Sequence, residues 1–180
     1  MTRFTSATLL AGLIFGLSSL VGAQNKYVGI MQCKMCHNTE KQGKHFDIWS
    51  KSKHAEAYKT LLTKAADSIA AKKGFKTKAV ETPECLGCHT ITADAKLLDK
   101  KFDVKDGVQC ESCHGPGSEY KNMAVMKDPK KAEAAGLHMF ADSAATAKLC
   151  VTCHNEKSPV VKKFDYAKMW PMIEHKTPKK

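Results

Sequence analysis

Cys33-Lys34-Met35-Cys36-His37 is the stretch that decides the fold of this chain, because its Cys-x-x-Cys-His pattern occurs three more times. The other runs are Cys85-Leu86-Gly87-Cys88-His89, Cys110-Glu111-Ser112-Cys113-His114 and Cys150-Val151-Thr152-Cys153-His154. Together the four runs use all eight cysteines of the 180-residue chain. Each run has the spacing at which c-type haem is attached to a protein.

The spacing has a chemical reason. Two thiols three positions apart can each form a thioether with one vinyl group of a haem, and the next imidazole then reaches the iron from the same side. The pattern predicts four haem c groups and eight thioether sites. It also predicts four proximal iron ligands, namely His37, His89, His114 and His154.

Two other uses of paired cysteines compete with this interpretation. Cys-x-x-Cys units also bind zinc, but a zinc site gives no reason for a histidine directly after all four pairs. Eight cysteines in an exported chain are also typical of a disulfide framework. The histidine after every pair favours haem over both.

Residues 1–23 have the features of a secretory signal peptide. Arg3 supplies a basic start, an apolar run follows from Ala7 to Val21, and small residues end the segment at Ala23. The run is shorter than the roughly 20 residues that span a bilayer, so we expect cleavage and no stable membrane insertion. The predicted domains are this peptide and a tetrahaem cytochrome c domain at 24–180. The expected location is the periplasm, with the cell exterior or a membrane surface as alternatives.

The formal net charge of +11 suggests a nucleic-acid or membrane partner only until the cofactors are counted. Loss of Arg3 and the addition of eight haem propionates would leave about +2. We therefore expect no nucleic-acid partner. Lysines still form two clusters that either steer an acidic redox partner or are simply solvated: Lys72, Lys73, Lys76 and Lys78, and Lys162, Lys163, Lys176, Lys179 and Lys180.

The expected fold class is mainly α with extensive loops. Few runs alternate β-branched residues, and Ala, Lys, Glu and Leu dominate between the motifs. Cleavage would leave about 39 residues per haem, so the fold is organised around four covalent haems that form its core. The second and third motifs are the closest in sequence and should hold neighbouring haems.

Residues 45–71 predict one long or two shorter amphipathic helices that end near Gly74. If this helix is continuous, His54 lies within its apolar arc and His45 lies on the opposite, charged face. Ser118 resembles the N-cap of a helix through Lys127.

Further along the chain, Asp128-Pro129 predicts a short helix that ends at Gly136, with His138 in the loop after it. The last predicted helix covers residues 165–175 and is disturbed by Pro171.

The second axial ligand of each iron is less certain from the residues than the first. His54 is the strongest candidate, because an imidazole within an apolar helix face needs a partner. His175, near Trp170 and Ile173, is the next. The weaker candidates are His138, His45 and two methionines, Met123 and Met126, at helical spacing.

The chain resembles the tetrahaem cytochrome c554 family between about Val28 and Lys176. The resemblance rests on Tyr27-Val28-Gly29, on the Trp49, Ser50, His54-Ala55 and Tyr58 pattern, and on Gly107-Val108-Gln109 leading into the third motif and Gly115-Pro116-Gly117. It implies that His54 ligates the third haem and His175 the fourth, and that the second haem, at His89, is five-coordinate.

The resemblance leaves the first haem in doubt. In the family this haem takes a histidine shortly after the Gly-Pro-Gly turn, and this chain has Met123 and Met126 there instead. Its iron would bind His37 with a methionine, with His138 or with His45, or it would be open. A histidine/methionine haem would have the highest of four spread potentials.

Three functions are compatible with the sequence. The leading one is an exported electron carrier between redox partner proteins, such as an oxidoreductase or a quinol-linked cytochrome, with no catalytic residue. The second is reduction of a small nitrogen oxide at an open haem, although the Cys-x-x-Cys-Lys motif of pentahaem nitrite reductases is absent. The third is a subunit of a polymeric haem filament, for which an exposed His45 is the only indication.

Overall fold

The structure is a computed structural model that describes residues 24–159 and 163–178, so the predicted signal peptide lies outside the described residues. The described part consists of short helices and loops, and its only β pairing is an isolated bridge between Tyr27 and Leu98. The expected class, mainly α with extensive loops, is confirmed. The α-helices are α1 (Ile30–His37), α2 (His45–Ser50), α3 (Ala57–Leu61), α4 (Lys64–Lys72), α5 (Pro83–His89), α6 (Cys110–His114), α7 (Met123–Met126), α8 (Pro129–Ala134), α9 (Ser143–Cys150) and α10 (Tyr166–Met169).

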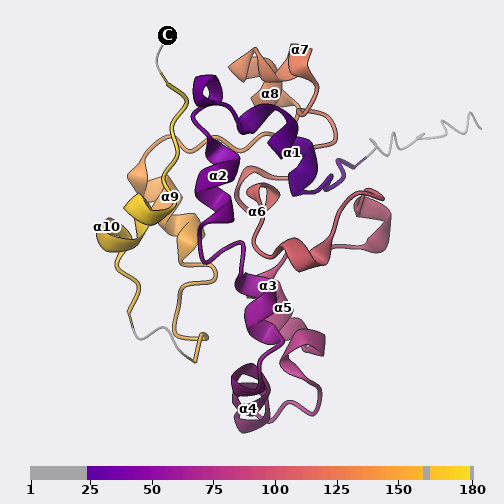
Figure 1. The fold of residues 1–180 in the computed structure, drawn as a ribbon, viewed down its shortest axis with the longest axis vertical. Coiled ribbons are helices and arrows are strands. Elements are labelled where there is room, and N and C mark those ends of the chain that lie inside the picture. Colours follow the sequence, from indigo (N-terminus) through magenta and orange to yellow (C-terminus); the bar gives the residue numbers. More distant parts are fainter. Residues whose placement is uncertain (1–23, 160–162, 179–180) are drawn as a thin grey trace, which may run out of the picture.

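Short 3₁₀ turns join several of these helices. They cover Glu40–Gln42, Ala79–Glu81, Ala95–Leu97, Val104–Asp106 and Trp170–Met172. In Figure 1, α6 lies near the middle of the molecule, α4 lies at one end of the long axis, and α7 and α8 lie together at the other. Helix α1 contacts both α2 and α6, and α3 contacts α5.

The segment from residue 45 to residue 71 differs from the prediction, since it forms α2, α3 and α4 in place of one or two helices. Ser50 and Ser52 end α2 because their hydroxyls donate to the Asp47 and Trp49 carbonyls, at 3.0 and 2.7 Å. His54 therefore lies in a turn, and His45 is the first residue of α2. The assumption of opposite faces on one helix is wrong.

The later elements agree with the prediction in part. Asn122, and not Ser118, caps α7, because the Asn122 side chain accepts from the Ala124 amide. Ser118 is instead bonded to the Lys26 amide at 2.9 Å. The Asp128 cap of α8 is confirmed. The tail helix is only α10, followed by a 3₁₀ turn that includes Pro171.

The loop before α1 is fastened to the third motif by two buried side chains. The Glu111 carboxylate accepts from the Val28, Gly29 and Gly117 amides at 2.7–3.0 Å. Gln109 accepts from the Ile30 amide at 2.9 Å and donates to the Asp103 carbonyl at 2.8 Å. These bonds bring the first and third motifs together although they are far apart in sequence.

The polypeptide supplies only a small apolar core of its own. One cluster of buried side chains, Leu61, Ala70 and Ala79, joins α3, α4 and the turn before α5. Several large apolar side chains are exposed, and Met35, within the first motif, is 75% exposed. A chain with this distribution depends on something other than its aliphatic side chains for most of its apolar burial.

Candidate haem-binding sites

The four motifs lie close together in space. The Cys33 and Cys110 thiols are near enough to affect each other's pKa, and so are those of Cys88 and Cys153. Residues of the second, third and fourth motifs line one cavity of about 240 Å³. The expected closeness of the second and third motifs is therefore seen, and the first motif lies near the third.

All eight cysteines are free thiols, which leaves both sulfur atoms of every motif available for a thioether bond. Burial raises the pKa of Cys113 to about 11, with the Cys150 and Cys153 thiols adding to the effect. Within residues 24–159 and 163–178, no three His, Cys, Asp or Glu side chains are arranged to hold a metal ion by themselves. The zinc interpretation therefore gains no support.

Two of the motif histidines are oriented for iron ligation. The Nδ1–H of His89 donates to the Ala57 carbonyl at 2.7 Å, and that of His114 donates to the His138 carbonyl at 2.9 Å. A carbonyl oxygen can only accept, so each ring carries its proton on Nδ1 and leaves the Nε2 lone pair free. This is the hydrogen-bond pattern that fixes a metal-binding histidine.

Burial also keeps the candidate ligands in the neutral form that binds a metal. It lowers the pKa of His37, His54, His114 and His154 below the usual value for histidine. The residues present therefore fit covalent haem c at the attachment motifs.

The histidines outside the motifs lie opposite particular motif histidines. Two imidazoles that bind one metal ion from opposite sides have ring centroids about 6 Å apart. This separation is the sum of two metal–nitrogen bonds of about 2 Å and the distance from each nitrogen to the centre of its ring. The His54 ring is centred 6.0 Å from that of His154, and the His175 ring 6.0 Å from that of His114. The Nδ1–H of His175 donates to the Ile173 carbonyl at 3.0 Å, which frees its Nε2.

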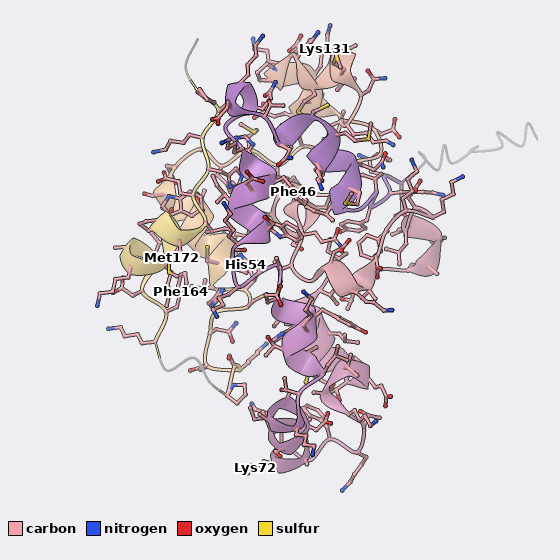
Figure 2. The ribbon with its side chains drawn as sticks, in the orientation of Figure 1. Phe46, His54, Lys72, Lys131, Phe164 and Met172 are labelled. Carbon is pink, nitrogen blue, oxygen red and sulfur yellow. The ribbon has the colours of Figure 1, made fainter. Side chains whose placement is uncertain are left out.

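These pairs differ from those implied by the resemblance, which assigned His54 to the third motif and His175 to the fourth. The structure places His54 beside the fourth motif and His175 beside the third. The His54 backbone is also held near the third motif, because its carbonyl accepts from the Val108 amide at 3.0 Å. The Phe164 ring packs on the His154 ring with centroids 4.8 Å apart. His54 and Phe164 come from separate parts of the chain and lie near each other in Figure 2.

A second cavity, of about 60 Å³, is lined by the two cysteines and the histidine of the third motif. His45, His54 and His175 line the same cavity, together with Trp49. The structure thus gathers three of the four histidines outside the motifs around α6.

The remaining candidate ligands are placed less favourably. The His138 residue is exposed, and the structure brings its backbone carbonyl, not its ring, into hydrogen-bond contact with His114. Met123 is 60% exposed and Met126 is half-buried, both on the four-residue α7, which contacts α8.

His45 was expected to be exposed among charged residues. This prediction is wrong, because His45 is half-buried against the rings of His37 and His175.

Comparison with known proteins agrees with this site. Residues 32–115 match the family described as cytochrome c554 and c-prime. The chain is also 27% identical over 165 residues to cytochrome c-554 of Nitrosomonas europaea. That alignment covers 81% of this chain and 66% of the relative. The chain is similar to the cytochrome c554 family. No solved structure matches it.

Similarity to the cytochrome c554 family supports a c-type cytochrome, a class of protein that binds haem c covalently. The alignment spans slightly less than two thirds of the relative's length. Among the described residues of this cytochrome c554 homologue, none of the helices has both the length and the apolar character needed to span a bilayer.

The sequence analysis missed the structural role of Glu111 in this cytochrome c554 homologue. The residue is 2% exposed, and burial raises the pKa of its carboxyl group, while the Val28, Gly29 and Gly117 amides oppose that rise. Its position between the cysteines of the third motif was the only signal available, and that position says nothing about the distant amides it binds.

Proposed function

We propose that this chain is an exported tetrahaem cytochrome c that carries electrons between redox partner proteins. The observation that supports this most directly is the closeness of motifs that are distant in sequence, since residues of the second, third and fourth motifs line one cavity and the Cys33 thiol affects the pKa of the Cys110 thiol. Haems attached at such thiols would be neighbours, and neighbouring haems pass electrons without help from an acid or a base.

In this proposal the protein holds, orients and shields the cofactors. A bound haem supplies one-electron redox chemistry. His89 and His114 keep their Nε2 atoms directed outward through hydrogen bonds to backbone carbonyls. His54 and His175 are proposed as second ligands at the fourth and third motifs, respectively. Two histidine ligands hold the reduction potential below that of a histidine/methionine pair.

The haem content tests the proposal. The purified holoprotein is expected to contain four haems per chain by pyridine haemochromogen assay and by intact mass, and to titrate reversibly with a chemical reductant. Replacement of both Cys85 and Cys88 with Ala should remove one haem and leave three. A holoprotein with fewer than four covalent haems would contradict the tetrahaem proposal.

Export is proposed from residues 1–23. N-terminal sequencing of the mature protein from the periplasm is expected to begin at Gln24. An intact N-terminus on the haem-loaded protein would contradict cleavage.

An acidic redox protein, such as an oxidoreductase or a quinol-linked cytochrome, is the proposed class of partner. Lys72, Lys76 and Lys78 are exposed, whereas Lys73 donates to the Lys157 carbonyl at 2.9 Å. Figure 2 shows Lys72 and Lys131 at opposite ends of the long axis. Basic groups at both ends would let one partner donate and another accept.

A second function is favoured by one observation at His89. Among the described residues, no histidine ring outside the motifs is paired with His89 as His54 and His175 are paired with their partners. Its iron is proposed to be open on one side and able to bind a small nitrogen oxide. Titration of the reduced holoprotein with nitric oxide should perturb one haem, and a protein inert to nitric oxide would contradict an open iron.

The filament alternative loses the feature that suggested it. It depended on an exposed His45 that could reach the iron of a neighbouring subunit. His45 is half-buried within its own chain, against the His37 ring, so it is not presented to a second subunit.

A further inference from the structure

We propose that His45 is the second histidine ligand of the iron bound at His37. This inference rests on the proposed function, because it needs a haem at the first motif. It gives that haem two imidazole ligands, in a chain that has no histidine shortly after the Gly-Pro-Gly turn.

The two rings are paired in space. The His37 and His45 rings have centroids 5.2 Å apart and planes that differ by 14°. This spacing is slightly below the separation of about 6 Å expected for two imidazoles on opposite sides of one metal ion. His45 also lies 4.8 Å from His175, but His175 has its own motif partner in His114 at 6.0 Å. His37 is therefore the motif histidine left for His45.

Nε2 of His45 is buried and makes no hydrogen bond with the described residues. A buried polar atom without a partner is costly, and an iron at the first motif would satisfy this nitrogen. Two other buried side-chain atoms in that part of the chain also lack a partner, Nδ1 of His37 and Ser112 Oγ.

The backbone before His45 is strained in a way that holds the ring in place. Gly43 and Lys44 are both left-handed, with φ of 81° and 51°. Lys44 is the one residue other than glycine with positive φ in the described part of the chain. For a residue other than glycine such a conformation is unfavourable, and it persists where the surroundings require it, often at ligand sites.

Gly43 also determines how much space lies beside the His45 ring. A Cβ atom on Gly43 would lie 2.8 Å from His45 Nε2 and would collide with the Lys176 carbonyl. A side chain at this position would crowd the nitrogen that we assign to the iron. The turn therefore fixes the direction of the His45 ring and leaves the space beside its Nε2 atom free of a side chain from residue 43.

The competing ligands for this iron have no comparable support. Met123 and His138 are exposed, and Met126 belongs to a helix that contacts α8. Two imidazoles would make the first haem low-spin, closed to small molecules and lower in potential than a histidine/methionine haem.

The test uses the holoprotein and its His45→Gly variant, compared by electron paramagnetic resonance and visible spectroscopy. We expect the variant to keep four haems but to lose one low-spin histidine/histidine signal and gain one high-spin haem. Added imidazole should restore the low-spin signal, because it can occupy the space left by the side chain. The same spectra for His138→Ala should match those of the native protein.

Several results would overturn the inference. One is an unchanged low-spin signal in His45→Gly, and another is loss of that signal in His138→Ala instead. A third is a histidine/methionine charge-transfer band in the native protein. If His45→Gly does not mature, His45→Met should accumulate with one new histidine/methionine haem, and its absence would count equally against the assignment. The haem count of the native protein separates failure of the proposed function from failure of this ligand assignment.

Discussion

At the scale of single residues, the structure depends on a few buried polar side chains near the third motif. Glu111 and Gln109 bind amides of the segment before α1, and Tyr120 donates to the Gly115 carbonyl at 2.6 Å. Trp49 donates from its indole nitrogen to the Val108 carbonyl at 2.7 Å. These bonds explain why the residues that carry the family resemblance cluster around α6.

The Glu111→Gln variant tests the strongest of these contacts. One carboxylate oxygen would become an amide nitrogen that faces backbone N–H donors. We therefore expect the holoprotein to lose about 1–3 kcal/mol of unfolding free energy. Chemical denaturation measures the loss. The matched variant Glu119→Gln changes an exposed neighbour and should stay within about 0.5 kcal/mol of the native value. Equal stabilities for the two variants would contradict the role given to Glu111.

At the scale of elements, side chains that hydrogen-bond to the backbone set where several of the short helices begin or end. Ser50 and Ser52 stop α2, Asn122 starts α7, and Asp128 starts α8. Gly107 shows why the loop before α6 needs a glycine. It has φ of 73°, and a Cβ there would lie 2.6 Å from the His54 carbonyl. This close approach holds the His54 backbone beside the segment that leads into the third motif.

The Gly43→Ala variant tests the turn before α2. Alanine disfavours φ of 81°, and its Cβ would meet the Lys176 carbonyl, so we expect a loss of about 1–3 kcal/mol. The control is Lys41→Ala, because Lys41 is exposed and lies in the neighbouring turn outside the motifs. That control should stay within about 0.5 kcal/mol of the native value. Thermal unfolding of both holoproteins distinguishes the two, and a neutral Gly43→Ala would remove the constraint.

At the scale of the whole molecule, the fold has one small aliphatic cluster, around Leu61, Ala70 and Ala79, and a central region built from motif residues. The cofactors would thus supply the burial that the side chains do not.

It follows that the haem-free chain should not fold. A variant with all eight cysteines changed to Ser, expressed without haem attachment, is expected to show no cooperative thermal transition by circular dichroism. The holoprotein measured in parallel should show one. A cooperative transition from the haem-free variant would mean that the polypeptide core is sufficient alone.

The sequence could predict the features that depend on residues close together in the chain. Two thiols and an imidazole must be close in sequence to bind one haem, so the attachment sites and the four proximal histidines follow from spacing. The cap of α8 at Asp128 and the helical class follow from equally local rules. The prediction of one long or two shorter helices over residues 45–71 was wrong, because serine hydroxyls near residue 50 compete with the backbone. Hydrophobic periodicity does not show this competition.

The sequence by itself therefore predicted haem c, its attachment points and one ligand of each iron, and it correctly gave the helical class. Only the tertiary structure decided which distant histidine faces which motif. It placed His54 beside His154, His175 beside His114, and His45, expected to be exposed, beside His37. The physical reason is that these pairings depend on contacts between segments far apart in the chain, such as Glu111 with Val28 and Val108 with His54.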